Sequence, residues 1–205
     1  MQRKKHNLEH SRVDNGRATT TPTHTEKVAG GAQDGSGLQD THVEHSDVDR
    51  LPYLRAVIRE TLRLHTVVPL VPNKAKEMVE IHGHTVPKGC TVLVNIWAVH
   101  HDAAVWPEPD SFMPERFLPP LRRDQETGFL GTTVFDLIPF SAGRRVCLGL
   151  PLATRMVHAM LGSLMHRFEW TLTPEAKENG VDMSEKLGVT LSMATPLQAI
   201  AKEYV

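Results

Sequence analysis

The sequence predicts a mixed α/β fold that is mainly helical, and three observations support this. Apolar residues repeat at three- and four-residue steps in two stretches, 54–62 and 152–164, which is typical of amphipathic helices. Between them, short β-branched runs alternate with Gly- and Pro-containing turns, as in small antiparallel sheets. A Pro-rich stretch and a glycine-flanked cysteine then precede the second helix. With 205 residues, the chain is long enough for one domain with its own core.

Composition and charge exclude several classes of function. The formal net charge is -1, so we expect no nucleic-acid partner. Cys90 and Cys147 are far apart, and the adjacent His100 and His101 lack a third ligand, which argues against a disulfide framework and a zinc site. No apolar run approaches the ~20 residues of a membrane span, and the N-terminus lacks the apolar core of a signal peptide. We therefore expect a cytoplasmic or peripheral chain without a membrane anchor.

The first 42 residues differ in composition from the rest of the chain. They are rich in Thr, Gly, Asp and His, so we expect a disordered or unrelated segment over 1–42 and one folded unit over 43–205. Pro52 marks the start of the first predicted helix. Glu60 and Arg63 share one of its faces, and this spacing alone favours a surface ion pair worth less than about 1 kcal/mol.

The middle of the chain favours extended structure. Pro69 and Pro72 forbid a helix and predict a kinked, extended stretch. Residues 78–97 then predict a small antiparallel sheet whose last strand covers 91–97. At the head of that strand, Cys90 is expected to be a small buried apolar side chain.

The part of the chain after this sheet predicts three kinds of structure. Residues 106–120 contain five prolines and predict an irregular meander, in which Glu115 and Arg116 would be solvated. The stretch 152–164 carries apolar residues on more than one face, which predicts a well-buried helix. The tail predicts two short strands joined by a turn at 195–196.

Cys147 lies in the most informative stretch, PFSAGRRVCLGLPLA at 139–153. Gly143 and Gly149 let the backbone approach a bulky flat group or adopt positive φ. A helix that starts just after the sulfur directs free N–H groups and its positive dipole end toward it, which favours a thiolate. Such a thiolate is either a soft metal ligand or a nucleophile, and this stretch alone leaves both open.

Five positions of this stretch resemble the haem-binding loop of the cytochromes P-450, the haem-thiolate monooxygenases: Phe140, Gly143, Arg145, Cys147 and Gly149. Two more motifs occur in the family's order. The Glu60-x-x-Arg63 pair is similar to the ExxR helix, and residues 114–117 are similar to the PERF motif. The resemblance covers 43–205 and implies the C-terminal part of the cytochrome P-450 fold: the ExxR helix, a small β-sheet, the meander, the cysteine loop, a long buried helix and a terminal β-hairpin.

The resemblance implies a haem site around this loop. Cys147 would be the axial ligand of the iron in haem b (iron protoporphyrin IX), and the other four matched positions would contact the cofactor. Arg145 would pair with a propionate, Phe140 would pack beside the sulfur, and Arg144 would belong to a basic face that meets a reductase. We assign no catalytic residue, since nothing in the sequence matches the acid and threonine that deliver protons to oxygen in the family.

Two further groups of residues take roles from the same resemblance. Glu60, Arg63 and Arg116 would form a buried ion-pair triad that braces the cysteine loop, instead of a surface pair and a solvated arginine. Two segments would line the substrate pocket: Val67, Val68, Pro69, Leu70, Val189, Thr190 and Leu191. Five positions depart from the family's usual pattern: Thr66, Asn73, His101, Ser141 and Leu148.

As a function, the resemblance implies a haem-thiolate monooxygenase that inserts one atom of O2 into a small lipophilic substrate such as a terpenoid. Electrons would come from NADPH through NADPH-cytochrome P-450 reductase, at the cytoplasmic face of the endoplasmic reticulum membrane. Stretches such as LPYLRAVIRETLRLH at 51–65 look most similar to plant enzymes of the geraniol 8-hydroxylase and ferruginol synthase group.

Two alternatives accompany this prediction. Family members are longer and carry a membrane anchor and a distal oxygen-activating helix that this sequence does not match, so we expect a truncated chain. The first alternative is a non-catalytic haem-binding or partner-binding remnant. The second is a cysteine-based redox or zinc protein, and the lack of a paired histidine pattern for Cys147 argues against it.

Overall fold

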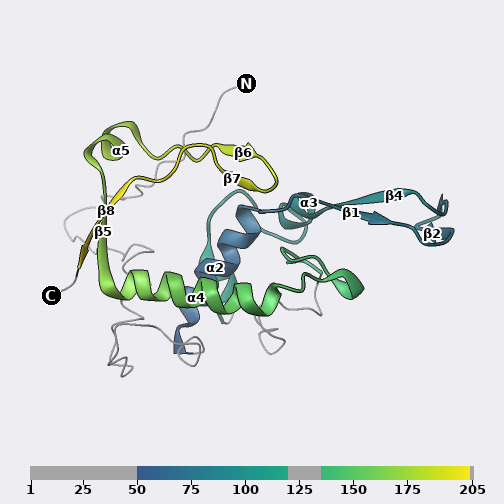
Figure 1. The fold of residues 1–205 in the computed structure, drawn as a ribbon, viewed down its shortest axis with the longest axis horizontal. Coiled ribbons are helices and arrows are strands. Elements are labelled where there is room, and N and C mark those ends of the chain that lie inside the picture. Colours follow the sequence, from purple (N-terminus) through teal and green to yellow (C-terminus); the bar gives the residue numbers. More distant parts are fainter. Residues whose placement is uncertain (1–49, 120–134, 204–205) are drawn as a thin grey trace.

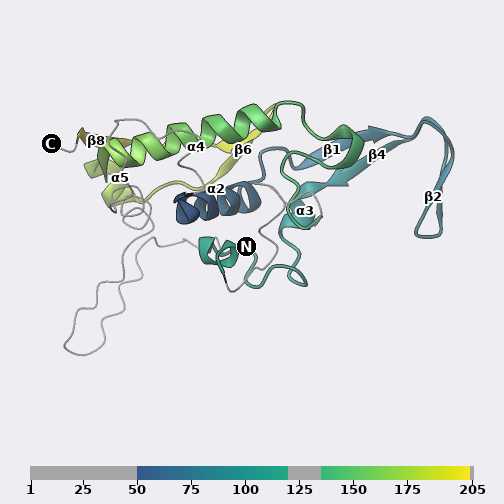
Figure 2. The same cartoon turned by 90° about the horizontal axis from the view of Figure 1, so that it is seen from below.

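The computed structural model describes residues 50–119 and 135–203. Two helices form its centre, α2 (Pro52–Leu64) and α4 (Leu150–Arg167). α2 crosses α4 in Figure 1 and lies beside it in Figure 2. Within the described ranges, the strands pair into two-stranded antiparallel sheets. The mixed α/β fold that the sequence predicts is therefore confirmed. The predicted boundary between 1–42 and 43–205 lies outside the described residues.

Helix α2 buries one face in a small apolar core. Leu51, Leu54 and Ile58 are almost fully buried, and Leu161 and Met165 of α4 pack against them. The three- and four-residue spacing of these side chains is that of one helix face. The periodicity of the sequence therefore predicts this contact face correctly.

A second apolar cluster connects α2 to segments that are distant in sequence. Ala56 of α2 is buried with Trp106, Phe117 and Leu137, and the rings of Trp106 and Phe117 lie 5.8 Å apart. Phe117 ends η2 (Pro114–Phe117), a short 3-10 helix in the Pro-rich meander. The irregular stretch thus forms an ordered wall of this second cluster.

A long two-stranded arm projects from the two helices (Figure 1). It consists of two successive two-stranded sheets, formed by β1 (Leu70–Lys74), β2 (Val79–Ile81), β3 (His84–Val86) and β4 (Thr91–Asn95). β1 pairs with β4, where Pro72 lies opposite Leu93, and β2 pairs with β3 at the far end. Each strand of a two-stranded sheet is an edge, and an edge tolerates proline. The kinked stretch around Pro72 is therefore a strand of the predicted sheet.

The structure corrects two predictions about β4 and the residue before it. The strand expected over 91–97 stops at Asn95, whose side chain accepts a hydrogen bond of 2.9 Å from Ala98 N and caps helix α3 (Ile96–His100). Cys90 is exposed, not buried: it directly precedes β4 in the arm, where its carbonyl accepts a hydrogen bond from Ala75 N.

The chain after α4 forms the C-terminal sheets. Its elements are β5 (Phe168–Leu172), α5 (Pro174–Asn179), β6 (Glu185–Leu187), β7 (Leu191–Met193) and β8 (Ala199–Glu203). β6 pairs with β7, which gives a hairpin near the C-terminus, and β8 pairs with β5. The two strands expected on either side of 195–196 are present as β7 and β8, but they belong to different sheets and do not pair with each other.

Helix α4 is present as predicted, but much of its apolar surface is exposed. The side chains of Leu152, Met156 and Met160 are 63%, 50% and 59% exposed. His158 and Gly162 are buried on the opposite face, which is the face that contacts α2. Within the described ranges, no helix is both long and apolar enough to cross a bilayer.

Candidate functional site

Glu60, Arg63 and Arg116 meet in a buried ion cluster. The Glu60 carboxylate accepts hydrogen bonds from Arg63 Nε at 2.9 Å, from Arg63 Nη2 at 2.8 Å and from Arg116 Nε at 3.1 Å. The side chains of Glu60 and Arg63 are 0% exposed, and that of Arg116 is 9% exposed. The spacing of Glu60 and Arg63 favours a surface pair, and the structure instead buries both. The name "buried ion cluster" refers to these three residues.

Backbone carbonyls of α3 and of the meander accept hydrogen bonds from the remaining donors of the two arginines. Arg63 Nη1 donates to His100 O and to Pro109 O, both at 2.8 Å, and Arg116 Nη1 donates to Pro107 O at 2.9 Å. The Arg63 guanidinium also lies 5.4 Å from the centre of the Trp106 ring. A buried charge is tolerable only when it is paired and hydrogen-bonded, and here both conditions hold. The cluster therefore joins α2 to an irregular segment that has little regular structure of its own.

The cysteine loop folds back on itself between the meander and α4. Cys147 N donates to Phe140 O at 3.0 Å, and Val146 N donates to Gly143 O at 3.2 Å. Gly143 starts η3 (Gly143–Arg145) at a φ of 66°, a conformation that glycine adopts without steric cost. Leu150 N then donates to Cys147 O at 3.2 Å as the helix begins.

Apolar contacts hold both ends of this loop on the second cluster. Phe140 and Leu150, one on each side of Cys147, pack against the buried side chains that include Trp106 and Leu137. The side chain of Cys147 is nevertheless exposed. The sulfur therefore lies on an open face of a loop whose base is fixed.

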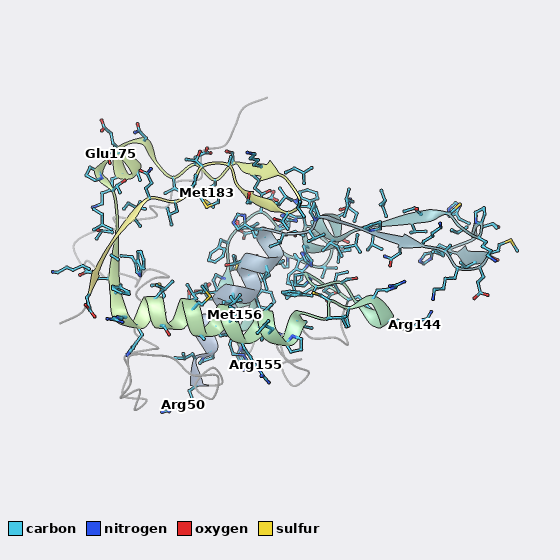
Figure 3. The ribbon with its side chains drawn as sticks, in the orientation of Figure 1. Arg50, Arg144, Arg155, Met156, Glu175 and Met183 are labelled. Atoms are coloured by element: carbon cyan, nitrogen blue, oxygen red, sulfur yellow. The ribbon has the colours of Figure 1, made fainter. Side chains whose placement is uncertain are left out.

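The residues around the sulfur leave room for a large flat group. A Cβ on Gly143 would meet nothing within 4 Å, and one on Gly149 would lie 3.6 Å from Cys147 Sγ. Arg144 and Arg145 are exposed, and in Figure 3 Arg144 lies at the end of the loop, beyond the start of α4. These observations fit a cofactor that covers the sulfur and meets a cationic side chain at its edge.

The two segments predicted to line a substrate pocket also come together. Leu191 N donates to Val67 O at 2.8 Å, and His65 Nδ1 lies 3.2 Å from Glu185 Oε1. Val67 is 40% exposed and Val189 is fully exposed, so these side chains face outward in the part of the chain that the structure describes.

Sequence reasoning missed the place of His100 beside this site. The sequence raises only a metal-ligand role for it, and within the described ranges no group of three His, Cys, Asp or Glu side chains could hold a metal ion. Its ring instead bonds to Thr66 and to Ile138. A non-local contact of this kind leaves no pattern in the sequence.

A comparison with protein-family models matches residues 20–198 to "Cytochrome P450". This chain belongs to the cytochrome P450 family. The match begins upstream of the boundary at 43 that composition predicts, and that boundary stays a prediction.

The relatives of this cytochrome P450 chain include plant hydroxylases. It is 52% identical over 160 residues to geraniol 8-hydroxylase of Swertia mussotii, covering 78% of this chain and 31% of that protein. It is 50% identical over 159 residues to geraniol 8-hydroxylase of Catharanthus roseus, covering 77% of this chain and 31% of that protein. The predicted similarity to plant enzymes of this type is confirmed. The chain spans about a third of the length of these relatives.

A solved structure gives the same family. A zebra fish cytochrome P450 determined with abiraterone matches with a TM-score of 0.76 and 32% identity, covering 89% of this chain and 41% of that one. The arrangement of helices and small sheets in this chain is therefore that of part of a cytochrome P450.

Proposed function

We propose that this chain supplies the cysteine-bearing side of a haem site in a monooxygenase that inserts one atom of O2 into a small lipophilic substrate of terpenoid type. The observation that carries this proposal is the exposed Cys147 on a loop with a fixed base. Family membership and the similarity to geraniol 8-hydroxylases support the reaction and the substrate class.

Haem b is the cofactor that this site fits. Cys147 would hold the iron as a thiolate, and Gly143 and Gly149 would let the backbone lie close to the porphyrin. The exposed Arg145 would pair with a propionate, while Phe140 would limit access of water to the sulfur from below. When bound, the haem supplies the oxygen chemistry, and the thiolate makes the iron more electron-rich.

The substrate and the redox partner are assigned to two faces of the chain. Val67, Val68, Pro69 and Leu70 would contact the substrate together with the neighbouring segment: Val189, Thr190 and Leu191. The exposed Arg144 would contribute to docking of NADPH-cytochrome P-450 reductase, because reductase docking is favoured by opposite charges across the interface. This partner would place the reaction at the cytoplasmic face of the endoplasmic reticulum membrane.

Absorption spectroscopy tests the haem assignment. The full chain is purified with haem, reduced, and exposed to carbon monoxide, and we expect the strongly red-shifted band of a thiolate-bound haem. Cys147→Ala should abolish this band. Cys90→Ala is the matched control, because that cysteine is also exposed but lies in the two-stranded arm, next to β4. Survival of the band in Cys147→Ala would refute the ligand assignment.

A second assay tests the reaction. The haem-loaded chain is incubated with reductase, NADPH and a monoterpenol, and hydroxylated product is measured. Haem retention without product under these conditions would instead favour a non-catalytic haem-binding role.

A further inference from the structure

His100 is a fully buried residue that contacts two separate segments, the C-terminal end of α2 and the start of the cysteine loop. Its ring Nδ1 lies 2.9 Å from Thr66 Oγ1, just after α2, and its Nε2 lies 3.0 Å from Ile138 N, just before the cysteine loop. Its backbone carbonyl accepts a hydrogen bond of 2.8 Å from Arg63 Nη1 of the buried ion cluster. The side chain is 0% exposed, so water cannot replace any of these partners.

The partners of the ring determine its protonation state. The Ile138 amide can only donate, so Nε2 accepts and carries no proton. The Thr66 hydroxyl donates to Arg63 O at 3.1 Å, so it is free to accept the proton on Nδ1. Burial, and then the neighbouring His101 and Arg63, lower the pKa of His100 to about 4. The ring is therefore a neutral bridge with one donor and one acceptor in use.

Backbone hydrogen bonds connect the segment around Ile138 to Cys147. The Ile138 carbonyl accepts a hydrogen bond from Ser141 N at 2.9 Å, and the carbonyl of Phe140, two residues further along, accepts one from Cys147 N at 3.0 Å. The residue fixed by the His100 ring thus lies at the base of the loop that carries the sulfur. Apolar packing of Phe140 gives the loop a second support, but it has no hydrogen-bond directionality.

We propose that His100 is a positioning residue for Cys147. Through Thr66 and Ile138, His100 couples the buried ion cluster to the cysteine loop. The ion cluster fixes the His100 backbone, and the His100 ring fixes the residue from which the loop departs. This inference rests on the proposed role of Cys147 as the haem ligand.

Two variants of similar size test the bridge. His100→Gln keeps an amide that can accept from Ile138 N and donate to Thr66, whereas His100→Met fills a similar volume and can do neither. His101→Gln is the control, because His101 is the adjacent, partly exposed histidine and stacks on Trp97 at 4.3 Å. If the methionine variant does not fold, Thr66→Val takes its place, with Thr66→Ser as its conservative partner.

The first measurement is hydrogen exchange of the Ser141 and Cys147 amides in the full chain, followed by NMR. We expect exchange to accelerate by roughly tenfold in His100→Met, the effect of losing a buried hydrogen bond, and to stay close to wild type in His100→Gln and His101→Gln. Faster exchange at Ile138 alone would overturn the proposal, because the loss would then stay local. Equal exchange in the glutamine and methionine variants would also overturn it, because volume alone would then explain the effect.

The second measurement is the absorption band of the reduced, carbon monoxide-bound chain. We expect His100→Met to lose part of the thiolate band, and His100→Gln to retain it. If the wild-type chain shows no such band, the proposed haem function fails, while the exchange of the two amides still decides whether His100 holds the loop.

Discussion

Replacing Glu60 by glutamine should cost far more stability than the same change in an exposed ion pair. Glu60 accepts from Arg63 at 2.8 and 2.9 Å and from Arg116 at 3.1 Å, and its Oε1 also accepts from Met113 N at 3.0 Å. An amide in its place leaves two guanidinium groups buried without a counter-charge, and turns an N–H toward other donors. Breaking a buried pair in this way costs ~3–5 kcal/mol, against a total stability of roughly 5–15 kcal/mol for a domain.

The exposed pair of Arg167 and Glu203 is the matched control for this prediction. Their Nε and Oε1 atoms are also 2.8 Å apart, but the two side chains are 43% and 57% exposed, so Glu203→Gln should cost less than about 1 kcal/mol. Urea unfolding followed by tryptophan fluorescence measures both free energies, since Trp106 lies 5.4 Å from the Arg63 guanidinium. Costs that are equal within error in the two variants would refute the argument that burial decides the strength of the cluster.

Two further predictions concern His100 and Gly143. The pKa of His100 is lowered from 6.5 to about 4 in the folded chain, so between these two pH values the unfolded chain binds more protons. The free energy of unfolding therefore falls as the pH falls from 6.5 to about 4, by about 3 kcal/mol in total. Urea unfolding of wild type and His100→Gln from pH 7 to pH 4 checks this, and a pH-independent difference between them would contradict it. Gly143→Ala should cost about 1 kcal/mol through its φ of 66° alone, because the added methyl group meets nothing within 4 Å. Gly188→Ala, an exposed position with an ordinary contact of 3.6 Å, should stay within about 0.5 kcal/mol in the same assay, and equal costs would exclude backbone strain as the cause.

The sequence predicts the local parts of this site because they depend on neighbours along the chain. The apolar spacing in α2 determines its buried face, and Gly143 permits the turn that closes the cysteine loop. Asn95 shows the limit of such reasoning. A β-branched run predicts a strand over 91–97, but one side-chain hydrogen bond to Ala98 N starts a helix within it.

The burial of charged groups could not be predicted from spacing. Glu60 and Arg63 have the separation of an ordinary surface pair, and only the meander, which folds over them, turns that pair into a core feature. The partners that satisfy Arg63 and Arg116 are carbonyls of irregular chain such as Pro107 O and Pro109 O, which carry no side-chain signal. On α4 the error has the opposite sign, because apolar side chains that the sequence predicts to be buried are exposed. Helical periodicity shows which residues are apolar, but it does not show what covers them.

The buried ion cluster is better suited to orienting the segments around it than to raising the free energy of unfolding. A well-packed apolar core of the same volume would often be equally or more stable, since the desolvation of two guanidinium groups and a carboxylate is costly. What apolar side chains lack is direction: Arg63 donates to Glu60, to His100 O and to Pro109 O along fixed vectors. One of those bonds ends on His100, whose ring accepts a hydrogen bond from Ile138 N at the base of the cysteine loop. The side chain of Cys147, the proposed ligand, is exposed, so packing around the sulfur does not fix its position. Directional hydrogen bonds at the base of the loop, such as the one from Ile138 N to His100, fix it instead.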